Sequence, residues 1–332
     1  MSENANEKET ILEVKNLFVE YSSNREIVRA VNGVSFSLRK GETLGLVGET
    51  GAGKTTIARS ILRILPDPPA RVAGGEIFFK GEDLQKISEK QMRKIRGREI
   101  SMIFQDPMTA LNPVMSVGKQ ISEAVRVHRK CSRKEAEEEG RKALELVGIP
   151  RERYNEYPHQ FSGGMKQRVV IAIALSCSPE LLIADEPTTA LDVTIQAQVL
   201  NLMYELQQNY RMSMILITHD LGVVAETCDI VGVVYAGEIV EYGTLRQVFR
   251  NPSHPYTVGL FGAIPSMSGD VGRLHNIEGM PCDPTNLPKG CKFAPRCRYA
   301  TEACRTGETM PLADLGDGHL CRCCHPLTGK ED

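Results

Sequence analysis

The chain has 332 residues, which is enough for about two domains with a sizeable core. Its 40 basic and 42 acidic residues leave a formal net charge of −2, so the overall charge does not favour nucleic acid or an anionic membrane surface as a partner. Apolar runs such as 169–175 are far shorter than the ~18 residues of a membrane span, and residues 1–10 lack the apolar centre of a signal peptide. We therefore expect a cytosolic chain that binds no nucleic acid.

The first part of the chain predicts strands and then a phosphate-binding loop. Residues 11–45 form short segments of alternating apolar and polar residues, as at 31–38, which predicts an antiparallel sheet. An apolar strand pattern at 44–47 and a helical pattern at 56–65 flank an octapeptide that fits G-x-x-x-x-G-K-[ST]. This order of strand, loop and helix is what a P-loop requires. The octapeptide is Gly48, Glu49, Thr50, Gly51, Ala52, Gly53, Lys54 and Thr55.

Each residue type in this loop suits the binding of a nucleotide phosphate. Glycines let backbone N–H groups curl around phosphate oxygens, and the helix that follows directs its positive end at the same oxygens. Lys54 is placed to reach the β- and γ-phosphates, and the Thr55 hydroxyl is placed to ligate Mg²⁺.

The central part of the chain predicts helices and then a strand that ends in two acids. The pattern is helical from 89 to about 176, and Ser132 with Glu135 forms a capping box. A buried-strand pattern at 181–184 precedes Asp185 and Glu186. At the end of such a strand, Asp185 is placed to hold Mg²⁺ and Glu186 to polarise an attacking water. Strand patterns at 230–235 and 238–242 follow, around Ala236 and Gly237.

A second anion site lies between these motifs. Ser162, Gly163 and Gly164 open the helical run that contains 169–175, and small residues at a helix N-terminus bind anions. Two anion sites in a chain with one P-loop make sense if the second site completes the pocket of a partner subunit.

Ser162-Gly163-Gly164 resembles the signature of ATP-binding-cassette (ABC) ATPases, and Met165-Lys166 resembles the form found in peptide importers. The resemblance covers about 11–265. It implies an α/β fold, the P-loop NTPase ABC cassette, with a RecA-like core, an antiparallel β lobe and a helical subdomain at about 89–176. It also implies ATP and Mg²⁺ as ligands.

The same resemblance assigns roles to other positions of this sequence. Gln105 resembles the Q-loop glutamine that meets Mg²⁺ or the attacking water, and His219 resembles the switch histidine at the γ-phosphate. Tyr21 stands where the family stacks an aromatic ring on adenine, and Thr56 joins the P-loop residues at the nucleotide. Residues 189–192 resemble the D-loop, which crosses to the partner subunit.

The last part of the chain, 266–332, is a cysteine-rich extension. Residues 251–256 and 290–297, then Cys304 and His319, resemble the extension of oligopeptide/dipeptide importer ATPases, some of which hold a [4Fe–4S] cluster there. Seven of the ten cysteines lie between 282 and 324, which favours metal over disulfides in a reducing compartment.

The spacing of these cysteines favours iron and sulfide over zinc. Cys291, Cys297 and Cys304 are not spaced as the x2 pairs of zinc ribbons, so the spacing mildly disfavours zinc. The resemblance indicates Cys323 as the fourth ligand, with Cys321 and Cys324 as competitors. Structural zinc and free thiols stay open as alternatives.

The resemblance as a whole implies the ATP-hydrolysing subunit of an importer for di- or oligopeptides at the cytoplasmic face of the membrane. The implied partners are a second ABC ATPase, more often different than identical, two transmembrane permeases and, indirectly, an extracytoplasmic substrate-binding protein. A sibling importer for nickel chelates or oligosaccharides stays open. A soluble ABC ATPase of DNA repair or translation is disfavoured, because the segment between Gln105 and Ser162 is too short for a long coiled coil and the chain has one P-loop.

Overall fold

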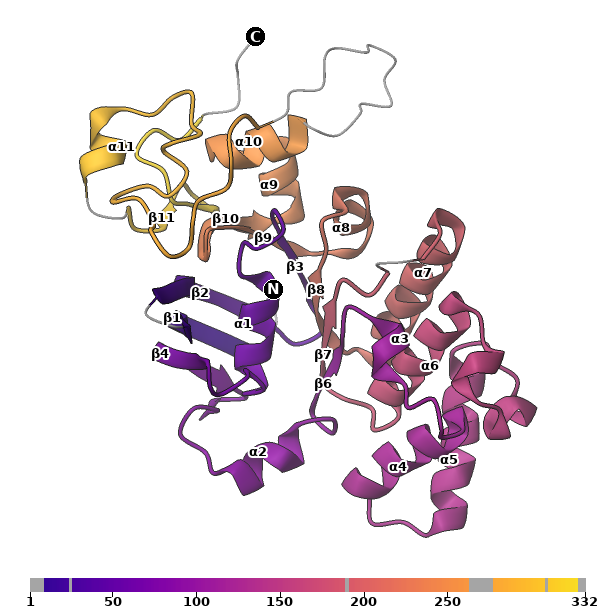
Figure 1. Cartoon of the computed structure of the whole chain (residues 1–332). Helices are drawn as coiled ribbons and strands as arrows, with labels where there is room; N and C mark the ends of the chain where they lie inside the picture. Colours follow the sequence, from indigo (N-terminus) through magenta and orange to yellow (C-terminus); the bar gives the residue numbers. More distant parts are fainter. Residues whose placement is uncertain (1–8, 24–25, 189–190, 263–276, 308–309, 328–332) are drawn as a thin grey trace, which may run out of the picture. The chain divides into compact units, whose positions relative to one another are not determined.

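The structure, a computed structural model, describes residues 9–23, 26–188, 191–262, 277–307 and 310–327 (Figure 1). The chain forms two compact units. The first comprises 1–11, 38–42 and 86–217, and we call it the helical unit. The second comprises 12–37, 43–85 and 218–332, and we call it the P-loop unit.

An antiparallel sheet lies at the start of the P-loop unit, as the sequence predicts. Strand β1 (Thr10–Ser23) pairs antiparallel with β4 (Ala70–Phe79), and β4 pairs antiparallel with β5 (Glu82–Asp83). Strand β2 (Glu26–Arg39) flanks β1. The alternating residues Val34, Phe36 and Leu38 of β2 are buried, which is why a period of two is visible in the sequence.

The core strands of the P-loop unit include β3 (Thr43–Val47), which is buried along its whole length. Strand β3 pairs in parallel with β9 (Ile230–Tyr235), and β9 pairs antiparallel with β10 (Glu238–Thr244). The turn between β9 and β10 consists of Ala236 and Gly237, both with positive φ (46° and 77°), as a tight two-residue hairpin requires.

The cysteine-rich extension continues this same group of strands. Strand β12 (Leu320–Cys321) pairs antiparallel with β10, and β11 (Ala313–Asp314) pairs antiparallel with β12. The predicted boundary between 265 and 266 lies outside the described residues. The helices of the P-loop unit are α1 (Lys54–Ile61), α8 (Leu221–Thr227), α9 (Leu245–Arg250), α10 (Pro255–Gly262) and α11 (Glu302–Thr306).

Helix α1 is shorter than the sequence pattern predicts. It ends at Ile61 instead of 65 because Arg63 adopts a left-handed conformation (φ 51°) and Pro66 follows closely. A proline disfavours helical geometry in the residue before it, so the apolar periodicity at 62–65 is realised as a turn.

The helical unit holds three parallel, fully buried strands. Strand β7 (Leu181–Asp185) pairs with β6 (Ile100–Ile103) on one side and with β8 (Ser213–Ile217) on the other. The prediction of a continuous helical pattern from 89 to 176 was wrong at β6. Its four buried residues form a run too short for periodicity to distinguish a strand from a helix.

Helices account for most of the remaining helical unit. Ser132 and Glu135 form the predicted capping box at the start of α5. None of the described helices has both the length and the apolar character to span a membrane. The helices are α2 (Glu89–Ile95), α3 (Pro107–Ala110), α4 (Val117–His128), α5 (Arg133–Leu146), α6 (Gly163–Leu175) and α7 (Val193–Tyr210), with 3₁₀ turns at Arg151–Asn155 and Pro158–Gln160.

Candidate functional site

The glycines of the P-loop are required by its backbone. Gly48 (φ 149°) lies so close to β9 that a Cβ there would be 2.1 Å from the carbonyl oxygen of Val234. Gly53 (φ 102°) packs against Ala30, whose carbonyl oxygen would be 2.4 Å from a Cβ. At Gly51 (φ 82°) a Cβ would meet no described atom within 4 Å. Two of the three glycines therefore allow close packing, and the third leaves the rim of the loop open.

Lys54 lies against the loop that it follows. Its side chain is 5% exposed, and its Nζ donates hydrogen bonds to the carbonyl oxygens of Gly48 (2.7 Å) and Glu49 (3.0 Å). Helix α1 begins at Lys54, and its N-cap residue Gly53 has no side chain with which to cap it. The first N–H groups of a helix attract anions, so the start of α1 suits a phosphate.

Tyr21 lies beside the same helix. Its hydroxyl is 3.3 Å from Oγ1 of Thr56, and both side chains are half-buried. The structure thus brings Tyr21 of β1 to the P-loop helix, as expected of a residue at the nucleotide. Stacking of its ring on adenine stays a prediction.

Glu49, the first variable residue of the P-loop, is held by the extension. Its backbone N–H donates to the hydroxyl of Tyr256 in α10 (3.0 Å), and its carboxylate pairs with Arg296 (2.8 and 3.1 Å). Sequence reasoning missed both residues. Neither lies in a nucleotide motif, although both lie in the segments 251–256 and 290–297 that resemble the importer extension.

In the helical unit, Asp185, Glu186 and Gln105 lie at strand ends. Asp185 closes β7 and is 1% exposed. Nε2 of Gln105 donates to Oε2 of Glu186 (2.8 Å), so the predicted base and the Q-loop glutamine are in contact. Glu186 has a positive φ of 45°, which is a strained conformation for a residue with a side chain. Such strain is found at catalytic positions, where the surrounding structure maintains it.

The predicted signature opens α6. Ser162 is the N-cap, and its Oγ accepts a hydrogen bond from the N–H of Met165 (3.4 Å). Gly163 is exposed, whereas Gly164 is buried. A Cβ added at Gly164 would lie 2.4 Å from Cγ2 of Ile195. The signature therefore presents an exposed serine and glycine at a helix N-terminus, the geometry that an anion site needs.

The remaining predicted residues lie near strand and helix ends. His219 is exposed and follows β8, directly before Asp220, which caps α8. Of the predicted D-loop, Thr189 and Ala190 lie outside the described residues, and Asp192 caps α7 through the N–H of Ile195 (3.0 Å). The P-loop, Tyr21 and His219 thus belong to the P-loop unit, and Gln105, Asp185, Glu186 and the signature belong to the helical unit.

The cysteines of the extension converge on one small cavity. All four predicted ligands line it, together with Cys324 and His325: they are Cys291, Cys297, Cys304 and Cys323. Cys321, a predicted competitor, is buried in β12 and does not line it. The ligand atoms of Cys304, Cys324 and His325 all lie within 4.8 Å of one another. Sequence reasoning did not single out His325, although it directly follows Cys323-Cys324.

Burial keeps most of these thiols protonated when no metal is bound. Burial raises the pKa of Cys291 and Cys297, and raises that of Cys323 to about 12. Burial acts in the same direction on Cys304, but hydrogen bonds with Thr301 and Cys324 outweigh it and lower its pKa. Mostly neutral thiols facing one cavity become good ligands when a metal displaces their protons, so this donor set fits a metal centre.

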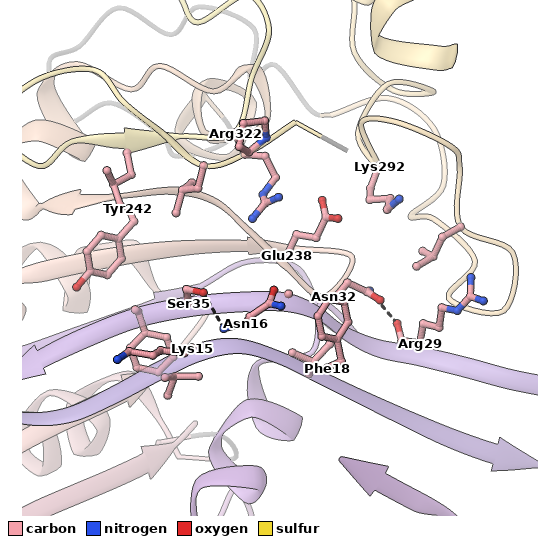
Figure 2. Close-up of a pocket in the computed structure, with 18 of the residues that line it drawn as sticks. Lys15, Asn16, Phe18, Arg29, Asn32, Ser35, Glu238, Tyr242, Lys292 and Arg322 are labelled. Atoms are coloured by element: carbon pink, nitrogen blue, oxygen red, sulfur yellow. Dashed lines mark hydrogen bonds between the residues drawn. The ribbon is translucent and has the colours of Figure 1, made fainter. Parts of the chain in front are cut away.

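A larger cavity of about 1360 Å³ lies in the P-loop unit between the antiparallel sheet and the extension (Figure 2). Glu238 points into it between Arg322 and Lys292 (Figure 2). This glutamate is only 3% exposed, and its carboxylate accepts no hydrogen bond from the described residues. Burial raises its pKa, an effect that Arg322 and Lys292 partly oppose.

Comparison with known proteins finds family models that match both the P-loop part and the C-terminal part of this chain. The ABC transporter family model matches residues 31–189, and the model "Oligopeptide/dipeptide transporter, C-terminal region" matches 240–304. The dipeptide transport ATP-binding protein DppD of Bacillus subtilis (strain 168) is 51% identical over 95% of this chain and 94% of its own length. The oligopeptide transport ATP-binding protein OppD of the same organism is 52% identical over 93% of this chain and 87% of its own length.

Solved structures resemble the cassette part of the chain. The ATP-binding cassette MJ0796, in a dimeric post-hydrolysis state bound to ADP and Pi, aligns with a TM-score of 0.64 and 25% identity over 71% of this chain and 99% of that one. The cbiO1 protein of Clostridium perfringens, part of the ABC transporter complex cbiONQ, aligns with a TM-score of 0.63 and 29% identity over 73% of this chain and 91% of its own. The fold is therefore that of the ABC cassette, as predicted, and the chain belongs to the ATP-binding proteins of the oligopeptide/dipeptide ABC transporter family.

Proposed function

We propose that this chain binds and hydrolyses MgATP and so drives the import of di- or oligopeptides by a membrane transporter. The observation that carries the proposal is the presence, in one chain, of a complete P-loop and of the C-terminal region at 240–304. The P-loop accounts for the ATP chemistry, and the C-terminal region narrows the class of transporter.

The proposed chemistry uses the P-loop, which follows β3, and the polar residues at the ends of β6, β7 and β8. Lys54 would bind the β- and γ-phosphates on leaving the carbonyl oxygens of Gly48 and Glu49. Glu186 would accept the proton of the attacking water, oriented by its hydrogen bond from Gln105. His219 would contact the γ-phosphate. Thr55, Asp185 and Gln105 would hold Mg²⁺, which when bound would supply positive charge at the phosphate oxygens.

The exposed Ser162 and Gly163 at the start of α6 support a dimeric working state. Ser162 and Gly164 would complete the nucleotide pocket of a second ABC ATPase, and that subunit's signature would complete this one. Two permease subunits would hold the pair at the cytoplasmic face of the membrane, and an extracytoplasmic binding protein would deliver the peptide. We propose a heterodimer with a different ATPase.

For the extension we propose a [4Fe–4S] cluster held by Cys291, Cys297, Cys304 and Cys323. The convergence of these thiols on one cavity supports it, and soft thiolates suit iron and sulfide. Cys324 lines the same cavity and Cys321 does not, so Cys324 is the alternative fourth ligand that the geometry favours. The cluster would supply folding energy to a segment with little apolar core.

The cluster is tested on anaerobically purified protein by measuring iron, acid-labile sulfide and zinc in parallel. About four iron and four sulfide per chain are expected. Stoichiometric zinc without sulfide, or no metal, contradicts the proposal. Cys323→Ser and Cys324→Ser, measured side by side, assign the fourth ligand, because the ligand variant loses iron and the other keeps it.

The transport function is tested by expressing the chain together with the proposed permeases and second ATPase. Labelled dipeptides and oligopeptides should enter cells or vesicles only when this chain is active, and a Glu186→Gln variant should abolish uptake. Uptake of a nickel chelate or an oligosaccharide in place of peptides would assign the chain to a sibling importer.

A further inference from the structure

An ion pair joins the cysteine-rich extension to the P-loop. The guanidinium of Arg296 contacts both carboxylate oxygens of Glu49, with Nη1 2.8 Å from Oε2 and Nη2 3.1 Å from Oε1. The side chain of Arg296 is 6% exposed and that of Glu49 is 26% exposed, so water screens the pair only weakly. A bidentate, largely buried pair fixes the orientation of both side chains.

Arg296 is itself held firmly on the side of the extension. Its Nε donates to the carbonyl oxygen of Glu278 (3.0 Å), and its Nη2 also donates to that of Ile277 (3.3 Å). Its guanidinium lies 5.9 Å from the ring centre of Tyr235. It directly precedes Cys297, which lines the cysteine cavity. The arginine is therefore an anchored group with a defined position.

Glu49 is held on its remaining sides as well. The hydroxyl of Tyr256 accepts a hydrogen bond from the backbone N–H of Glu49. Tyr256 is fully buried, and its ring centre lies 4.6 Å from that of Tyr235 and 5.4 Å from that of Phe293. The carbonyl oxygen of Glu49 accepts a hydrogen bond from Lys54 (3.0 Å). The residue that the extension restrains is thus one that contacts the phosphate-binding lysine.

We propose that Arg296 is a positioning residue for the nucleotide site, acting through Glu49. The inference rests on the proposed function, because it assumes that the P-loop binds a nucleotide. The physical reason is charge: a carboxylate beside Gly48 would repel a bound di- or triphosphate, and Arg296 both neutralises it and holds it back against the extension. The extension is then a part of the ATP site and not only an appended domain.

The test measures the dissociation constant for MgADP, by calorimetry, on the full chain. Arg296→Gln leaves the Glu49 charge uncompensated, so we expect its repulsion of the phosphates to weaken binding about ten-fold, which corresponds to about 1.4 kcal/mol. Glu49→Gln removes the repelling charge and keeps the Arg296 cation, so its binding should be as tight as that of the parent or tighter. The double variant Arg296→Gln with Glu49→Gln should recover most of the loss, which a purely structural role of Arg296 would not produce.

Arg298→Gln is the matched control, because Arg298 lies in the same loop but bonds to the neighbouring Tyr299. Its affinity for MgADP should equal that of the parent. Parent-like affinity of Arg296→Gln, an unrescued double variant, or an equal loss in Arg298→Gln would each overturn the proposal. If Arg296→Gln does not fold, Arg296→Lys replaces it, because the lysine keeps the charge but loses the bidentate contact. We then expect a smaller loss of affinity for MgADP, again rescued by Glu49→Gln.

The failure of this inference can be distinguished from a failure of the proposed function. Lys54→Ala is measured in the same calorimeter. If the parent binds no MgADP, or if Lys54→Ala binds as the parent does, the nucleotide site itself is wrong. If Lys54→Ala weakens binding and Arg296→Gln does not, only the role of Arg296 is rejected.

Discussion

Replacing Glu238 by glutamine should stabilise the protein at neutral and alkaline pH. Glu238 is 3% exposed, lines the cavity of Figure 2 and accepts no hydrogen bond from the described residues. Removing a buried charge of this kind recovers part of its desolvation cost, whereas the amide that replaces it is neutral. Because Arg322 and Lys292 already compensate part of the charge, we expect a gain of about 1–2 kcal/mol in the free energy of unfolding.

The gain should depend on pH with a definite sign. Burial raises the pKa of Glu238 in the folded state, so the folded parent binds a proton more tightly than the unfolded chain does. The parent therefore loses stability as pH rises from the unfolded pKa of about 4.3 through the raised folded value. The advantage of Glu238→Gln should be absent below about pH 4 and complete above the folded pKa.

Glu241 on the same strand is the matched control with the opposite expectation. It is fully buried, and its carboxylate accepts hydrogen bonds from the N–H groups of Ser253 and His254 and from Nε2 of His319, all at 2.8 Å. Glu241→Gln should cost about 2–4 kcal/mol, because a satisfied buried network is broken.

Urea denaturation of the full chain between pH 4 and 8.5 measures both variants. The reasoning is refuted if Glu238→Gln unfolds at a lower urea concentration than the parent at pH 8. It is also refuted if the difference between Glu238→Gln and the parent does not change with pH.

Three further predictions concern the nucleotide site. Lys54→Ala should abolish ATP hydrolysis and weaken nucleotide binding, since it removes the P-loop charge that faces the phosphates; near-normal turnover of the assembled transporter would contradict the P-loop assignment. Glu186→Gln should bind MgATP but hydrolyse it about 10²–10⁴-fold more slowly, and an ATP-bound dimer with the partner ATPase should accumulate on gel filtration. Parent-like hydrolysis would show that Glu186 is not the base. Gly53→Ala should destabilise the chain by more than about 3 kcal/mol in urea denaturation, because its Cβ would clash with Ala30, whereas Gly51→Ala should cost only the ~1–2 kcal/mol of a left-handed backbone. Equal costs at the two glycines would refute the packing argument.

Much of the cassette follows from local sequence patterns. The strand at 181–184 and the hairpin strands at 230–235 and 238–242 each form, and the capping box at Ser132 starts α5. These features depend on contacts within a few residues, so periodicity and capping chemistry are enough to predict them. The same locality explains the errors: β6 is too short to show a period, and α1 ends where Arg63 and Pro66 turn the chain.

The motifs of the nucleotide site are local as well, because a P-loop is one strand, one loop and one helix. Its chemistry and the family resemblance therefore follow from residue order. The contacts of Arg296 and Tyr256 with Glu49 do not follow from residue order, because both residues lie more than 200 positions after Glu49 in the sequence. The choice among Cys321, Cys323 and Cys324 as cavity-lining residues likewise depends on which side chains the fold directs inward around β12. Folding brings such distant residues together, and no spacing rule along the chain encodes which pairs will meet.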